Sequence, residues 1–225
     1  EPLVEVTQVK GDSETHPILS PTDEFADYET WNSWEHNIKQ RGLDKPSTDW
    51  SNAEKNKKRF EYARSALKLG LEKQFKLGIN PFKFGMIGSS DAHTSLSMVS
   101  ENNYGGRNSI PDEPPNPKRI ERFSNSAAGY AGIWATENTR EALFAAMKRK
   151  ETYATTGPRM SVRFFGGWDY HPDDAFKSDL ASIGYNKGVP MGGDLTNGPE
   201  GKSPNFLIRT VKDPDGANLD RMQVI

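Results

Sequence analysis

The order of the secondary-structure patterns is the feature that most constrains the fold of this chain. Strand-like and helix-like patterns alternate through about residue 155, which is typical of an α/β layer architecture. After the stretch TYATTGPR the helical period disappears except over residues 173–182, and short strands are separated by turns rich in Gly, Asn, Asp and Pro. The sequence therefore predicts an α/β domain at residues 1–157 and a β-rich, sandwich-like unit at residues 158–225.

The clearest single element is a helix predicted over residues 51–78. Its apolar residues recur at steps of three and four and are expected to face the core: Phe60, Ala63, Leu67, Leu71 and Phe75. Gly78 is expected to end this helix, because glycine adopts the left-handed conformation that closes many helices. A second helix is predicted over residues 138–150, with Asn138 as its N-cap.

Strands are predicted on both sides of the boundary. In the first part they are expected at residues 3–9, 82–88 and 129–137. In the second part the segments MSVRFFGGW, NFLIRTVKD and LDRMQVI have the composition of strands, and the last of them spans residues 219–225. We expect these later strands to pair antiparallel and to pack apart from the α/β part.

The composition excludes several classes of function. The net charge is -2 with both signs mixed, so nothing indicates binding to nucleic acid or to an anionic membrane. No apolar run approaches the roughly 20 residues needed to span a bilayer. The chain has 0 cysteines, so a bound metal would need His, Asp, Glu or water as ligands. The composition leaves the cellular compartment open.

The stretch GMIGSSDAHTS at residues 85–95 brings Asp91 and His93 to the end of a predicted strand, where α/β folds often build their sites. Glu14 and His16 follow another predicted strand. Carboxylate and imidazole together suit Zn, Mn or Fe. We therefore expect Glu14, Asp91 and His93 to converge on one divalent metal site.

Other interpretations of these residues stay open. The Asp-x-His pair could serve in a cap or a turn, Glu14 could be a surface carboxylate, and His16 could be held by the turn at Pro17. Arg140 and Arg159 could bind a substrate phosphate through two parallel hydrogen bonds. Arg140 could equally be an ordinary first-turn helix residue.

Three blocks carry a resemblance to a known family: TQVKGDSETHPILSPTDEFADYE, YARSALKLGLEKQFKLGINPFKFGMIGSSDAHT and GIWATENTREALFAAMKRKETYATTGPRMSVRFFGGW. In this order they resemble the bacterial domain-of-unknown-function family 3604, over nearly the whole chain. That family is itself similar to the polymerase-and-histidinol-phosphatase (PHP) superfamily of metal-dependent phosphoesterases.

The resemblance implies a fold and an activity. It implies part of a PHP-like distorted (β/α) barrel, followed here by a partial β-sandwich, with divalent metals at the carboxyl ends of the barrel strands. Asp91 and His93 match an SDAH-type ligand motif and would be catalytic, and Glu14 matches an acidic ligand. The implied function is hydrolysis of a small phosphorylated substrate by metal-activated water, with His16, Arg140 and Arg159 as further substrate-contacting candidates.

One motif of the superfamily is missing. Its first His-x-His segment would lie before Glu1, so we expect this stretch to be a carboxyl-terminal fragment that is inactive alone and active in the intact protein. Its signal region would then lie outside this stretch, and a periplasmic or exported location in a bacterium is compatible with this.

Two alternatives to a phosphoesterase stay open at this point. One is an amidohydrolase-like enzyme that cleaves C–N or C–O bonds with the same metal-activated water. The other is a non-catalytic module that binds carbohydrate or protein. The aromatic residues that permit the second alternative are Trp31, Trp34, Trp50 and Trp168.

Overall fold

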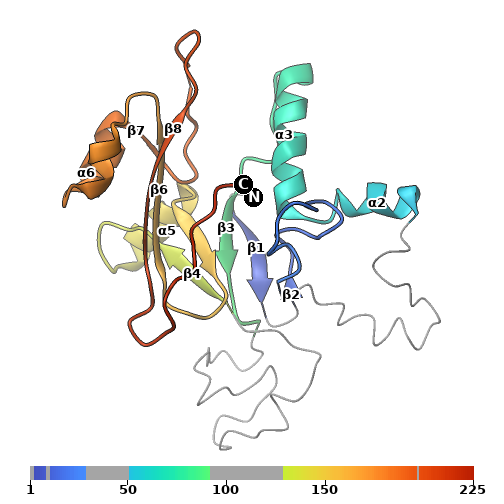
Figure 1. The fold of residues 1–225 in the computed structure, drawn as a ribbon, viewed down its shortest axis with the longest axis horizontal. Coiled ribbons are helices and arrows are strands. Elements are labelled where there is room, and N and C mark those ends of the chain that lie inside the picture. Colours follow the sequence, from blue (N-terminus) through green and yellow to red (C-terminus); the bar gives the residue numbers. More distant parts are fainter. Residues whose placement is uncertain (1–2, 9–10, 29–50, 92–128, 197) are drawn as a thin grey trace, which may run out of the picture.

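The computed structural model describes residues 3–8, 11–28, 51–91, 129–196 and 198–225. These residues form a mixed α/β structure with three small sheets, and no closed barrel is present among them (Figure 1). None of the helices in the described part is long and apolar enough to cross a membrane.

The first sheet has the strand order β2-β1-β3. Strand β1 (Leu3–Gln8) forms a hairpin with β2 (Gly11–Asp12) and pairs in parallel with β3 (Gly85–Gly88). The predicted strands at 3–9 and 82–88 are thus confirmed. Because β1 and β3 run in the same direction, their carboxyl ends lie at one edge of the sheet.

The second sheet pairs β4 (Tyr130–Ile133) with β5 (Thr152–Thr155), and α5 (Arg140–Lys148) lies between them in sequence. The sheet lies directly against β3, because the side-chain hydroxyl of Thr152 donates a 3.1 Å hydrogen bond to the carbonyl oxygen of Met86. The helix expected at 138–150 is present, but its cap was predicted wrongly. Thr139, not Asn138, accepts the capping hydrogen bond from the Ala142 N–H.

The helix predicted over residues 51–78 is two helices, α2 (Asn52–Lys58) and α3 (Ala63–Leu77). The second one begins anew at Ala63 because the N–H groups of Ala63 and Arg64 donate to the carbonyl oxygens of Ser13 and Glu14, at 2.9 and 3.0 Å. This contact supplies acceptors for the first turn of α3, whose N-cap side chain makes no capping hydrogen bond. Gly78 ends α3 in the left-handed conformation, as predicted.

The predicted core face of that helix is also partly wrong. Ala63 is buried, but Phe60, Leu71 and Phe75 are 67%, 67% and 92% exposed. After the break at residues 59–62, the buried side of α3 is formed by Ala63, Leu69 and Gly70 instead. A hydrophobic period that runs from α2 into α3 without this break therefore assigns the wrong face of α3 to the core.

The third sheet has the order β7-β6-β8, with β6 (Ser161–Gly167) at its centre. Both neighbours, β7 (Gly188–Pro190) and β8 (Asn205–Val211), pair antiparallel with β6, so the predicted antiparallel pairing is confirmed. A small core joins this sheet to α6 (Leu180–Lys187) and to the segment just before η2 (Pro172–Phe176). Its buried members are Phe165, Tyr170, Leu180 and Leu207.

The predicted strand at residues 219–225 is wrong, because this segment joins none of the sheets. It is held by side chains instead. Arg221 forms an ion pair with Glu24, and its guanidinium carbon lies 5.1 Å from the centre of the Phe25 ring.

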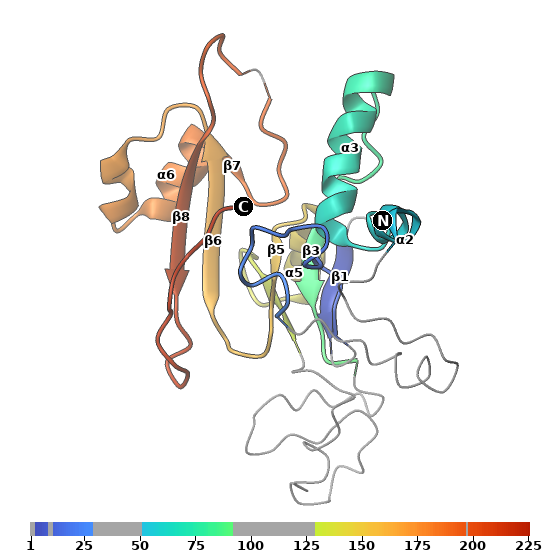
Figure 2. The same ribbon diagram turned by 45° about the vertical axis from the view of Figure 1, so that its right-hand side comes forward.

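The β4–β5 sheet lies between the other two sheets in both views (Figures 1 and 2). It contacts the third sheet directly, because the indole N–H of Trp134 donates a 2.8 Å hydrogen bond to the carbonyl oxygen of Val162. The division into domains at residue 157 stays a prediction.

Candidate functional site

The edge where β1 and β3 end is the first candidate site. The chain leaves β3 through Ser89, whose N–H donates a 3.0 Å hydrogen bond to the carbonyl oxygen of Thr7, and then reaches Asp91. Asp91 has a φ of 49°, a left-handed conformation that Asp tolerates better than most residues. Its Oδ2 atom is buried. Asp91 therefore lies just past the shared edge of the two parallel strands, as its sequence position predicted.

The other two predicted metal ligands are placed differently. His93 lies outside the described residues. Glu14 lies beyond the hairpin, which turns the chain back, since the N–H of Ser13 donates to the carbonyl oxygen of Val6 at 2.8 Å. Glu14 therefore comes directly after Ser13, which lies beside Val6 in the middle of β1. The convergence of Glu14, Asp91 and His93 stays a prediction.

Glu5 is a carboxylate at this edge that was not among the predicted site residues. The hydroxyl of Ser89 donates to its Oε1 atom, and the side-chain amide of Gln8 donates to its Oε2 atom at 2.9 Å. The signal that could have found Glu5 is its charge in the otherwise apolar run LVEV. Glu5 is thus a second acidic group that contacts the segment leading to Asp91, through its hydrogen bond with Ser89.

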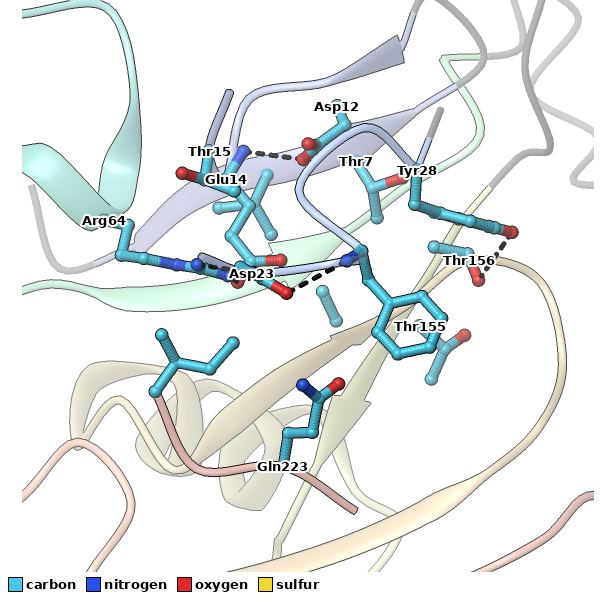
Figure 3. Close-up of a pocket in the computed structure, with 14 residues that line it drawn as sticks. Thr7, Asp12, Glu14, Thr15, Asp23, Tyr28, Arg64, Thr155, Thr156 and Gln223 are labelled. Atoms are coloured by element: carbon cyan, nitrogen blue, oxygen red, sulfur yellow. Dashed lines mark hydrogen bonds and ion pairs between the residues drawn. The ribbon is translucent and has the colours of Figure 1, made fainter. Parts of the chain in front are cut away.

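A cavity of about 300 Å³ lies between β1, the turns that follow β2, the first turn of α3 and the end of β5 (Figure 3). The side chains that line it are those of Val6, Thr7, Asp12, Glu14, Thr15, Asp23, Phe25, Tyr28, Arg64, Ala154, Thr155, Thr156, Gln223 and Ile225.

The side chain of Arg64 in α3 lines the cavity and binds two carboxylates at once (Figure 3). Its guanidinium nitrogens lie 2.6 Å from the Oε1 atom of Glu14 and 2.9 Å from the Oδ2 atom of Asp23. The hydrogen bond from Arg64 lowers the pKa of Asp23, assisted by the N–H of Phe25. Glu14 is therefore already engaged by a cation of the protein itself.

Asp12 is a carboxyl group of the cavity lining whose pKa is raised. Burial raises its pKa to about 6. The N–H of Glu14, which donates to its Oδ1 atom at 2.6 Å, opposes that rise, and the negative charge of Glu14 adds to it. Asp12 can therefore gain or lose a proton near neutral pH, as residues with acid–base roles do. The sequence around Asp12 gave no signal of this burial.

His16 is a buried residue of the turn, only 5% exposed. Its Nδ1 atom accepts a 3.2 Å hydrogen bond from the N–H of Ile18, and its ring centre lies 5.7 Å from that of Tyr62. Burial lowers its pKa, and the charge of Lys58 lowers it further. His16 does not line the cavity.

The two arginines proposed for phosphate binding do not line the cavity either. Arg140 is exposed at the first position of α5. Arg159 is exposed, its guanidinium carbon lies 6.0 Å from the centre of the Tyr130 ring, and its backbone N–H donates to Asp213 at 2.6 Å. Their role toward a substrate stays a prediction.

The donor atoms fit a divalent metal only in part. Asp91 offers a buried carboxylate oxygen at the sheet edge, which is a ligand that Zn, Mn and Fe accept. Glu14 offers another, but Arg64 holds it. Within the described ranges, no three His, Cys, Asp or Glu side chains are grouped closely enough to hold a metal ion.

Comparison with known proteins identifies a family but no function. A family model described as "Protein of unknown function (DUF3604)" matches residues 1–225. No curated protein and no solved structure matches the chain.

Proposed function

Since this chain belongs to the DUF3604 family of proteins of unknown function, we propose that it forms part of a metal-dependent hydrolase, specifically a phosphoesterase. The proposal includes the fold that the resemblance implies, a distorted (β/α) barrel of the PHP type followed by a partial β-sandwich. It rests on the order of the three sequence blocks and on the geometry of one sheet edge.

The observation that carries the proposal is the parallel pairing of β1 and β3. Parallel strands place their carboxyl ends at one edge, where enzymes of α/β folds bind their ligands. Asp91 comes directly off this edge with its Oδ2 atom buried, and Glu5 contacts Ser89 beside it. A buried carboxylate in this place is what a divalent metal site requires.

In this proposal Asp91 and His93 hold the metal, which is Zn, Mn or Fe. A bound divalent ion supplies a water molecule of lowered pKa and withdraws charge from a phosphoryl oxygen. Glu14 becomes a metal ligand only after it gives up its ion pair with Arg64. Arg64 then keeps Asp23 as its partner, so that its charge stays balanced.

The experiment compares metal content and hydrolysis in this 225-residue chain and in the full product of its gene. We expect the full product to retain about one or more equivalents of Zn, Mn or Fe and to hydrolyse p-nitrophenyl phosphate. The Asp91→Asn variant should lose activity at least on the order of 100-fold, because even partners of metal ligands cost 10–100-fold when removed. The 225-residue chain alone should be inactive.

The matched control is Asp169→Asn, which removes an exposed carboxylate that pairs with the exposed side chain of Lys202. It should leave metal content and turnover unchanged. A full product without bound metal, or one that cleaves amides but no phosphate ester, contradicts the phosphoesterase proposal.

A further inference from the structure

The cavity of Figure 3 has a lining of unusual charge for a site that would take a phosphorylated molecule. Its described lining carries three carboxyl groups, on Asp12, Glu14 and Asp23, and one guanidinium, on Arg64. Both carboxylate contacts of Arg64 are short, 2.6 and 2.9 Å, so its charge is already matched inside the wall. An anion entering this space would meet net negative charge.

The same lining is rich in groups that bind hydroxyls. Thr155 at the end of β5 and Thr156 just after it line the cavity together with Thr7 and Thr15. The hydroxyl of Thr155 accepts from the N–H of Gly157 at 3.4 Å, so its proton remains available for donation. A ligand hydroxyl can both accept from such groups and donate to the carboxylates.

Two aromatic rings complete the wall. Phe25 and Tyr28 line the cavity and are 45% and 49% exposed. The Tyr28 hydroxyl donates to Thr156 at 3.5 Å, which links the turn after β2 to the end of β5 (Figure 3). An apolar ring face beside polar groups suits a molecule that has both C–H faces and hydroxyl edges.

We propose that this cavity binds a small, neutral, polyhydroxylated molecule of the sugar class. The volume of about 300 Å³ lies at the lower end of the range for small-molecule sites, about 300–1,000 Å³. Carboxylates accept from the sugar hydroxyls, threonines donate to them, and the rings cover an apolar face. This inference goes beyond the proposed hydrolase, because it requires no metal.

The experiment measures binding to the 225-residue chain by saturation-transfer NMR and calorimetry at pH 7.5 in EDTA, so that a failed metal proposal does not affect it. The neutral probes are D-glucose, D-galactose, D-mannose and D-xylose. Glucose 6-phosphate and putrescine serve as the anionic and cationic probes. We expect at least one neutral sugar to bind with a millimolar or lower Kd, and glucose 6-phosphate to bind at least about 10-fold more weakly than glucose.

Variants locate the binding. Thr156→Val removes one lining hydroxyl and should weaken sugar binding about fivefold, which is the usual effect of losing one hydrogen bond. Tyr28→Phe should weaken it similarly and serves as the second test if the first variant folds poorly. Thr136→Val, which changes an exposed threonine outside the cavity, should leave the Kd unchanged.

Several outcomes overturn the inference. These are the absence of binding by all four sugars, tighter binding of glucose 6-phosphate or of putrescine than of any sugar, and sugar binding that neither Thr156→Val nor Tyr28→Phe weakens.

Discussion

At the scale of single residues, Gly88 explains why glycine ends the strand that leads to Asp91. A Cβ atom at this position would lie 2.7 Å from the carbonyl oxygen of Tyr130 and 2.8 Å from that of Thr155. Both oxygens belong to strands of the second sheet, so neither can move without disturbing β4 or β5. The absence of a side chain lets the second sheet approach β3 closely, on the side where the cavity forms.

The Gly88→Ala variant is therefore expected to be less stable by ~2 kcal/mol, in the range for overpacked cores. The measurement is urea denaturation at pH 7. Gly166→Ala is the matched control, because a Cβ atom there would meet its nearest neighbours at 3.7 Å, an ordinary contact. Equal stability of the two variants would show that β3 and the second sheet do not pack as described.

The sequence predicted the position of Asp91 but not the ion pairs of Arg64. A carboxylate directly after a short apolar strand is a local pattern, and Asp91 fits it. Arg64 and Asp23 are 41 residues apart, and Glu14 and Arg64 are 50 apart. Nothing in either local pattern indicates that they meet, because the meeting depends on where α3 docks.

At the scale of elements, short-range patterns predicted several strands and the helix α5, but not the strands β5 and β7. Strands β1, β3, β6 and β8 lie within the runs that were predicted from their apolar and β-branched residues. The break between α2 and α3 was missed because its cause is tertiary, the contact of the first turn of α3 with the carbonyl groups of Ser13 and Glu14.

The link between η2 and α6 gives a pH-dependent prediction. Asp174 lies in η2, and Lys187 at the end of α6 donates to it at 2.7 Å. This hydrogen bond, with that from the N–H of His171, lowers the pKa of Asp174. A lowered carboxyl pKa stabilises the fold above the unfolded-state value of about 4, and the stabilisation is lost as the pH falls through the folded-state value.

Asp174→Asn should accordingly lower the urea midpoint at pH 7, and the difference from the unaltered chain should shrink as the pH falls below about 4. Asp173→Asn is the control, because that neighbouring carboxylate is 76% exposed and pairs with an exposed imidazole. A midpoint difference for Asp174→Asn that stays constant from pH 7 to pH 3 would argue against the ion pair.

At the scale of the whole molecule, one polar cluster joins the second and third sheets. Glu151, which precedes β5, is 3% exposed. Arg163 of β6 lies 3.7 Å from its carboxylate, and the guanidinium carbon of Arg163 lies 3.4 Å from the ring centre of Trp134. Tyr185 of α6 donates to Glu151 and accepts from Arg163 at 3.1 Å. Three elements therefore share one buried charge.

Arg163→Met should lower the free energy of unfolding by ~2 kcal/mol, because it leaves the buried Glu151 with less compensation and removes the contact with Trp134. Hydrogen exchange should accelerate in β4 and β6 together. The exposed pair of Lys202 and Asp169 supplies the control, Lys202→Met, which should change stability by no more than about 0.5 kcal/mol. Faster exchange in β6 alone would show that the cluster does not couple the two sheets.

The arrangement of the sheets could be predicted only in part. The turn-rich, strand-like sequence after residue 157 predicted the antiparallel third sheet correctly, since this is a property of local sequence. The helix α6 also lies in this part of the chain, close to the exception expected at residues 173–182. The cavity could not be predicted, because hairpin, turn, helix and strand contribute to it from positions far apart in the chain. Its closing wall includes Gln223 of a segment that was expected to be a strand.

The parallel pairing of β1 with β3 also constrains the order in which the chain can fold during its synthesis. Leu3 pairs with Gly85, so a ribosome must deliver the chain past residue 88 before β1 gains this partner. Pairings between distant residues form slowly, since the intervening chain must first lose conformational freedom. Until then the hydrogen-bonding edge of β1 that pairs with β3 lacks this partner, and the cavity forms later still, because Thr155 and Thr156 also line it.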